Sequence, residues 1–221
     1  MRKILTIVIL LCSSVSWAQS EIEENIPILN DIASRWTQKN IPVTVTHKGK
    51  PVHDYAQAIC AQFSDYLPNA YMVDYLSSPG NYTYEEKHYL VEDDPRHGFI
   101  KIDGGGQFDF MTEVCYWKRK NGHALVAVLL QIGHEGEGQY TDAALLFYDF
   151  NPKTHMLTPD MLVKRDVDTI LARHDGKPNF ELPKEDKDIS LSYTKWDPEE
   201  DFIFEDYTLK WTGNSFREVS E

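Results

Sequence analysis

The pair Asn121-Gly122 is the feature that most constrains the fold of this chain. Asn-Gly tolerates the two positive φ angles of a type I′ turn, whose twist suits a two-residue β-hairpin. The segments on either side, roughly 108–119 and 124–132, are predicted to be the strands of that hairpin. A Gly-rich loop, residues 133–138, leads to a third apolar segment at roughly 141–150. Together these segments predict three consecutive antiparallel strands.

The second and third of these strands are apolar on both faces. In the second, one set of apolar residues alternates with another: Ala124, Val126, Val128, Leu130 and Ile132 against Leu125, Ala127 and Leu129. In the third, Leu145 and Phe147 alternate with Leu146 and Tyr148. A strand with one solvated face would alternate apolar with polar residues. Both strands are therefore expected in the middle of a sheet that is covered on each side.

Helical periodicity appears outside this central meander. Apolar residues recur at helical spacing over about 27–39, 51–66 and 158–173. Short alternating segments elsewhere, such as Tyr71, Val73 and Tyr75, indicate further strands. The strands follow one another without a helix between each pair, so a βαβ array is not indicated. We predict a single α+β domain in which an antiparallel sheet of about seven to nine strands is packed by about three helices.

Residues 1–18 have the pattern of a cleaved signal peptide. Arg2 and Lys3 precede an apolar run, and Ser16-Trp17-Ala18 offers small residues where signal peptidase reads them. The apolar run is too short to remain as a membrane span. Lipid attachment at Cys12 is the alternative, but Leu11 fits poorly the small residue normally needed before it. We expect a secreted or periplasmic protein comprising residues 19–221, with no transmembrane segment.

The charge is strongly acidic. The chain has 22 basic and 35 acidic residues, a net charge of −13, which becomes −15 when the leader with its two basic residues is removed. Nucleic acid and anionic membrane surfaces attract positive patches, so neither is an expected partner. An extracellular or envelope protein is compatible with this charge, a cationic one in particular, although acidity also serves solubility alone.

Cys60 and Cys115 are the cysteines of the predicted mature chain. In an oxidising compartment an even pair indicates a disulfide, which would join the helix at 51–66 to the first strand of the meander. The alternative is two buried free thiols. Neither cysteine has a neighbouring histidine, so a catalytic thiol is not predicted.

The Gly-rich loop carries His134, Glu135 and Glu137. Imidazole and carboxylate groups can bind a divalent metal or act as general base and acid, and a hydrolase working around these three residues is one hypothesis. The competing interpretation is a solvated hairpin loop, because no HExxH helix or fixed ligand spacing is present. We therefore predict no resident metal and no cofactor.

Two further loops carry weaker signals. Asp103-Gly104-Gly105-Gly106 lacks the lysine and hydroxyl of a P-loop and is predicted to be a connector. Asp93, Asp94 and His97 form an acidic loop whose spacing does not match a calcium-binding EF-hand, so a solvated turn is expected.

Aromatic residues are the remaining site candidates. Trp117, Trp196 and Trp211, with Tyr116 and Tyr207, could be stacking platforms for sugars, although aromatic residues also serve sheet packing. Trp117 joins His134, Glu135 and Glu137 as the binding residues that we select.

No catalytic set is present, so a non-enzymatic binding module for an extracellular protein or glycan is the leading hypothesis. The hydrolase is the first alternative. The second is a structural subunit of an envelope assembly, which would show an exposed apolar patch or an open sheet edge.

Overall fold

The structure is a computed structural model of the whole chain, in which residues 29–78, 80, 82–83, 87, 89–104, 110–133, 140–176, 178–197 and 201–220 are described. Their helical segments are residues 29–35 with the 3-10 turn η1 (Trp36–Gln38), α2 (Pro51–Gln62), α3 (Leu67–Ser77) and α5 (Met161–Leu171). Their strands are β1 (Ile41–Pro42), β2 (Leu90–Asp94), β3 (Phe99–Asp103), β4 (Phe110–Lys118), β5 (Ala124–Gly133), β6 (Tyr140–Asn151), β7 (Met156–Pro159), β8 (Pro178–Glu181), β9 (Ile189–Asp197), β10 (Asp201–Trp211) and β11 (Phe216–Ser220).

Two antiparallel sheets form the fold. A seven-stranded sheet has the order β1-β7-β6-β5-β4-β3-β2, and a four-stranded sheet has the order β11-β10-β9-β8. The α+β class and the central antiparallel meander are confirmed. The second sheet, in which β8 to β11 pair only with one another, was not predicted, and the strands outnumber the prediction because β1, β7 and β8 are too short to show an alternation.

The central hairpin forms at the predicted place with a different turn. Gly122 has a φ of +84°, and Asn121 has no positive φ. The Arg119 N–H donates to His123 O and the Gly122 N–H donates to Arg119 O. This is a type I turn followed by a left-handed glycine, which makes a three-residue loop instead of the predicted two-residue type I′ turn.

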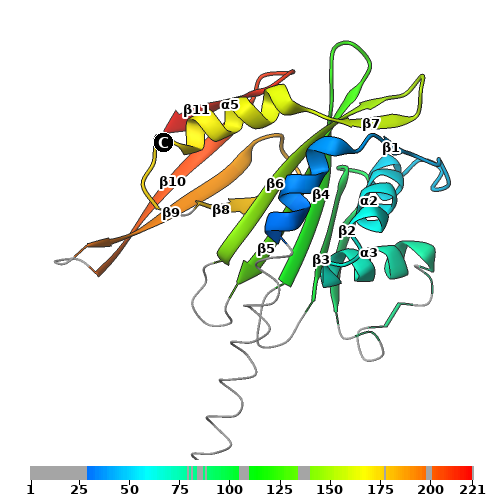
Figure 1. Cartoon of the computed structure of the whole chain (residues 1–221), viewed down its shortest axis with the longest axis horizontal. Helices are drawn as coiled ribbons and strands as arrows, with labels where there is room; N and C mark the ends of the chain where they lie inside the picture. Colours follow the sequence, from blue (N-terminus) through cyan, green and yellow to red (C-terminus); the bar gives the residue numbers. More distant parts are fainter. Residues whose placement is uncertain are drawn as a thin grey trace, which may run out of the picture.

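The seven-stranded sheet is covered on both faces, as the apolar strands predict. Even-numbered residues of β5, such as Val126 and Val128, pack with the first helix, α2 and α3, whereas Leu125 and Leu129 pack with α5 and the four-stranded sheet. Figure 1 shows the first helix (blue) lying across the sheet, α2 and α3 beside it, and the orange and red strands extending from the other side. We call these the helical face and the strand face.

Two buried polar side chains join the sheets across the strand face. β8 is an edge strand that pairs only with β9. The amide of Gln131 accepts a hydrogen bond from Phe180 N (3.3 Å) and donates one to Phe180 O (3.2 Å), so it takes the place of a neighbouring strand. The Leu182 N–H donates to Glu113 Oε2 at 3.0 Å. Buried backbone groups need such partners, and β4 and β5 supply them with side chains.

Two local predictions were wrong. Tyr71, Val73 and Tyr75 alternate as a strand would, yet residues 67–77 form α3, whose buried residues Met72 and Leu76 lie four apart. The helix predicted to begin at Thr158 begins at Met161 instead. Asp160 caps it by accepting a hydrogen bond from Val163 N, and the preceding residues form β7.

The predicted disulfide is not formed. Cys60 and Cys115 are both free and buried. Cys60 belongs to the core of the helical face and Cys115 to the core of the strand face, so the sheet itself separates them. Side chains alternate between the faces of a strand, and α2 covers the face opposite to Cys115. Burial raises the pKa of both thiols.

Candidate functional site

A surface hollow of about 290 Å³ lies where ends of strands from the two sheets meet, and we call it the aromatic cleft. It is formed by the turn between β2 and β3, the end of β4, the segment between β8 and β9, and the last residue of β10. The lining residues are Arg96, His97, Tyr116, Trp117, Lys118, Glu185, Asp186, Lys187 and Trp211. Three of the five aromatic residues selected from the sequence therefore converge on one hollow.

The floor of the aromatic cleft is a group of stacked rings. The rings of Trp117 and Trp211 are stacked with centroids 5.6 Å apart, and Phe216 contacts both. Trp117 is only 4% exposed, and its indole N–H donates to Lys187 O at 2.8 Å. Trp211 is partly exposed. Trp117 thus supports the floor and holds the 184–187 segment, while Trp211 is the ring that a ligand can reach.

Charged side chains surround this floor. Arg96, Lys118 and Lys187 are exposed cationic groups on the rim, and Glu185 and Asp186 are exposed carboxylates. The His97 ring lies 2.7 Å from Asp94 Oδ2 and lowers the pKa of that carboxyl through their hydrogen bond. Three cationic groups and two carboxylates give these rim residues one net positive charge, in a chain whose net charge is −13.

A glycine allows the turn between β2 and β3 to close one side of the cleft. Gly98 has a φ of +80°, a conformation that residues with a Cβ rarely adopt. A Cβ at Gly98 would also lie 2.5 Å from the Tyr116 ring. Only glycine therefore lets Arg96 and His97 approach the end of β4.

Tyr207 does not line the cleft, because its ring instead contacts His174 and Tyr193. The remaining selected residues cannot be compared with this site. His134, Glu135 and Glu137 lie outside the described residues, as do the side chain of Trp196 and residues 105–106 of the glycine run. The prediction of a binding or catalytic role for the Gly-rich loop stays a prediction.

Sequence reasoning missed a buried cluster of histidine–carboxylate pairs under the helical face. The ring of His53, 1% exposed, lies 2.7 Å from Asp93 Oδ1, and Tyr75 OH donates to Asp93 Oδ2 at 2.8 Å. His47 Nδ1 lies 2.9 Å from Asp54 Oδ1, and the His47 and His53 rings meet edge to face. Asp93, predicted to lie in a solvated loop, is thus part of a network that joins α2, α3 and β2.

Hydrogen bonds dominate the electrostatics of this cluster. Burial by itself would raise the pKa of Asp54, but the Thr46 and His47 backbone N–H groups donate to the same carboxylate oxygen and the net pKa is lowered. The pKa of Asp93 is lowered in the same way, with burial opposed by the hydrogen bonds from His53 and Tyr75. None of these side chains lines a hollow described here, so the cluster is interpreted as a structural element.

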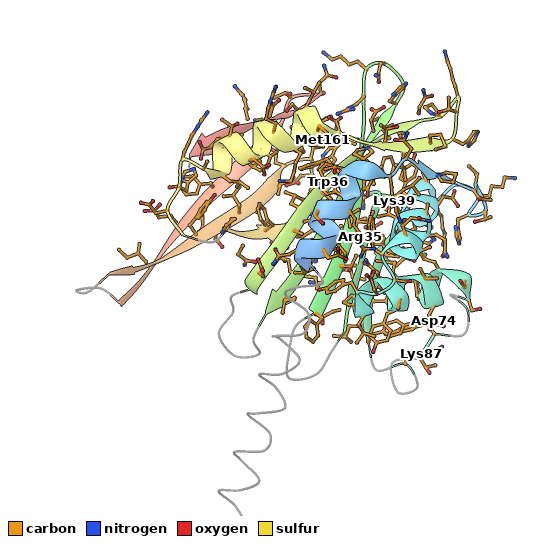
Figure 2. All side chains as sticks on the ribbon, viewed as in Figure 1. Arg35, Trp36, Lys39, Asp74, Lys87 and Met161 are labelled. Atoms are coloured by element: carbon orange, nitrogen blue, oxygen red, sulfur yellow. The ribbon has the colours of Figure 1, made fainter. Side chains whose placement is uncertain are left out.

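Within the described part of the chain, no three His, Cys, Asp or Glu side chains are placed to hold a metal ion. No described helix has the length and apolarity needed to cross a membrane. The exposed ion pair Asp74–Lys87 (2.9 Å), labelled in Figure 2, joins α3 to the segment before β2 and is not part of the aromatic cleft.

Comparisons with models of protein families, with curated proteins and with solved structures found no match to this chain. The functional argument therefore depends on the geometry of the molecule.

Proposed function

We propose that this protein is an exported, non-enzymatic glycan-binding module and that the aromatic cleft is its binding site. The observation that supports the proposal is the partly exposed ring of Trp211, held on a stacked aromatic floor and surrounded by exposed hydrogen-bonding groups. Binding hollows generally combine such an apolar surface with a few polar groups that orient the ligand.

Each part of the cleft matches a part of a sugar ring. The C–H groups on one face of a pyranose are apolar and pack against an aromatic face, as other apolar groups do. The hydroxyl groups project around the ring, where carboxylates such as Glu185 and Asp186 accept hydrogen bonds and ammonium groups such as Lys118 donate them. Because Arg96, Lys118 and Lys187 outnumber the rim carboxylates, a glycan that carries a carboxylate is favoured over a neutral one.

Export is part of the same proposal. The leader at residues 1–18 would deliver residues 19–221 to the periplasm or the exterior, where envelope and dietary glycans occur. The amino-terminal sequence of the protein recovered from outside the cytoplasm tests this step. A chain that begins at Gln19 supports it, and a chain that retains Met1 contradicts it.

The binding test uses residues 19–221 and a panel of soluble neutral, uronic-acid-containing and amino-sugar oligosaccharides. Trp117 and Trp211 lie in the site, so tryptophan fluorescence is a direct signal, and calorimetry supplies the affinity. We expect saturable binding of an acidic oligosaccharide. Trp211→Ala should weaken it at least tenfold, which corresponds to about 1.4 kcal/mol.

Two further variants separate binding from folding. Trp211 packs on Phe216, so its loss also affects stability. Lys118→Glu changes an exposed rim residue and should weaken binding of an acidic glycan without lowering the unfolding temperature. Lys153→Glu, an equal charge change in the exposed turn between β6 and β7, is the matched control and should bind as the parent does. The proposal would be contradicted if the parent, Trp211→Ala and Lys118→Glu bound the oligosaccharide with equal affinity. It would also be contradicted if the parent bound no oligosaccharide of the panel.

A further inference from the structure

The aromatic cleft adjoins two further hollows along the 181–188 segment, which connects β8 to β9. The first, the middle hollow, measures about 530 Å³, is formed by this segment and shares Glu185 and Asp186 with the cleft. The second, the outer hollow, measures about 260 Å³ and lies on β8, β9 and β10. It shares Glu181 and Ser190 with the middle hollow. The three hollows therefore follow one another along the surface.

Hydrogen bonds tie the cleft directly to the middle hollow. The backbone N–H of Trp211, whose ring a ligand can reach in the cleft, donates to Asp188 Oδ1 at 2.8 Å, and Asp188 lines the middle hollow. The Asp188 N–H donates in turn to Asp186 Oδ1 at 3.2 Å, and Asp186 lines both hollows. A ligand that extends past the Trp211 ring in this direction enters the middle hollow.

The outer hollow lies on the face of the four-stranded sheet that points away from the core. Phe180 and Leu191 are buried in the core of the strand face, so their neighbours along each strand point to the opposite face. Figure 1 shows β9, in orange, between β8 and β10. Two rows of polar residues lie across these strands: Glu181, Ser190 and Thr208 in one, and Asn179, Ser192 and Asp206 in the other.

The polar groups of the two rows are available to a ligand. Among the described residues, none of these six side chains has a hydrogen-bond partner. Hydroxyl and amide groups both donate and accept hydrogen bonds, whereas carboxylates only accept them. Sugar hydroxyl groups also donate and accept, so neutral sugars match this face.

Charge differs between the two ends of the series of hollows. Arg96, Lys118 and Lys187 line the cleft alone. The middle hollow has one cationic residue, Lys184, and it is paired with Glu92 outside the hollow at 2.8 Å. Beyond the cleft the lining charges are therefore mainly carboxylates. A glycan with an acidic group on every sugar would place like charges opposite one another there, which is unfavourable.

The distance covered indicates a ligand of several sugars. Trp211 in the cleft and Asp206 in the outer hollow are five residues apart on β10, which corresponds to about 17 Å along a strand. This distance exceeds the length of a disaccharide. The cleft alone, at about 290 Å³, is only as large as the smallest of typical small-molecule pockets.

We propose that the three hollows form one binding track for an extended oligosaccharide that has an acidic sugar at one end and neutral sugars along the rest. The acidic sugar lies on Trp211 among the cationic groups of the cleft. The neutral sugars cross the 181–188 segment and form hydrogen bonds with the two polar rows of the outer hollow. This inference rests on the proposed function of the cleft and adds the length and the charge pattern of its ligand.

The test measures calorimetric affinities of residues 19–221 for three ligands at physiological salt. The first is a hexasaccharide with one terminal uronic acid and five neutral hexoses, made with the acid at each end in turn, and the tighter-binding form is used. The second is the terminal disaccharide that contains the same uronic acid. The third is a hexasaccharide of six uronic acids. We expect the first to bind at least roughly tenfold more tightly than the second, and the third to bind no more tightly than the second.

Variants locate the far end of the track. Ser190 is exposed where the middle and outer hollows meet, so Ser190→Ile adds bulk and removes a hydroxyl group there. It should reduce the affinity for the long ligand to that for the disaccharide, whose own affinity should not change. Thr158→Ile, at an exposed hydroxyl residue of β7, is the matched control and should bind both ligands as the parent does. Thr208→Val, which removes only a hydroxyl group, should weaken the long ligand roughly fivefold.

The track and the cleft fail in different ways. Equal affinity of the parent for the long ligand and the disaccharide, or an unchanged affinity of Ser190→Ile for the long ligand, would overturn the track and leave the cleft as the binding site. If the parent bound neither ligand, or Trp211→Ala weakened neither, the proposed function would be contradicted and the track with it. Equal binding of the two hexasaccharides would overturn the charge pattern.

Discussion

The two faces of the seven-stranded sheet are covered by different kinds of element, and the polar groups beneath them differ accordingly. Helices satisfy most of their own backbone groups, so no side chain of the sheet has to replace a neighbouring strand on the helical face. Its buried polar groups are instead side-chain pairs such as His53–Asp93. β8 crosses the strand face with one edge unpaired, and Gln131 and Glu113 of the sheet complete its hydrogen bonds.

The carboxylates of the two faces consequently respond to pH in opposite directions. Hydrogen bonds lower the pKa of Asp54 and Asp93 on the helical face against the effect of burial. On the strand face, burial raises the pKa of Glu113, and Lys101 and the Leu182 N–H offset only part of the shift. The helical face is therefore the acid-sensitive half of the core. The aromatic cleft lies at the rim of the strand face.

Removal of the Gln131 amide should give the largest loss of unfolding free energy. Gln131→Leu introduces an apolar residue of similar size and leaves Phe180 N and O buried without partners, at about 1–3 kcal/mol for each group. Urea unfolding at pH 7 measures the loss. Leu129→Met, a buried control on the same strand, should cost less than about 1.5 kcal/mol. A loss from Gln131→Leu no larger than the control's would show that the side chain does not substitute for a strand.

Asp54→Asn should have the next largest effect and should remove an acid-sensitive contribution. The carboxylate accepts hydrogen bonds from Thr46 N and His47 N, both 2.9 Å long, and bonds to an ionised acceptor contribute about 1.5–3 kcal/mol. Because the folded pKa is lowered, this stability is present above the unfolded pKa of about 3.9 and is lost as the pH falls through the folded value. Unfolding free energies from pH 7 to pH 2 should fall less steeply in the variant than in the parent.

Glu113→Gln should have a smaller effect with the opposite dependence on pH. A raised folded pKa means that stability is lost as the pH rises from about 4.3, the unfolded value, through the folded one. Glutamine can still accept the Leu182 N–H bond, so the variant should lose this decline while retaining β8. The same pH series checks it. Both proteins are compared in an Asp54→Asn background. If the unfolding free energy of the protein that keeps Glu113 does not decline between pH 4 and neutrality, the raised pKa of Glu113 is contradicted.

Reduction of the protein should have no effect on its stability, because its two described cysteines are not bonded. Cys60 and Cys115 are free and lie on opposite faces, so a reducing agent should leave the unfolding temperature unchanged, and thiol reagents should label two cysteines only after unfolding. A disulfide closing this loop would instead contribute roughly 4 kcal/mol that reduction removes.

The sequence predicts those parts of the fold that depend on neighbours along the chain. The alternation of Val126 with Leu125 was sufficient to place β5 in a sheet covered on both faces. It could not reveal that Gln131 completes β8, because the partner is 49 residues away and a polar residue near a strand end carries no signal of its own. The alternation of Tyr71 and Tyr75 favoured a strand because aromatic residues are enriched in strands. Their place in α3 shows that they also fit a helix.

The candidate site was only partly predictable for the same reason. The aromatic residues could be selected by type, but Trp117 and Trp211 meet across 94 positions of sequence only because β4 and β10 belong to facing sheets. Cys60 and Cys115 show the converse, since their pairing depended on which face α2 covers. Sequence spacing does not determine that choice.

Amide hydrogen exchange with and without the acidic oligosaccharide is the most direct test of the central claim that ligands bind at the rim of the strand face. The account predicts added protection in residues 95–98 and 184–188 and at the end of β10, with no change in α2 or α3. Protection confined to α2 and α3, or no protection in a saturated complex, would contradict it.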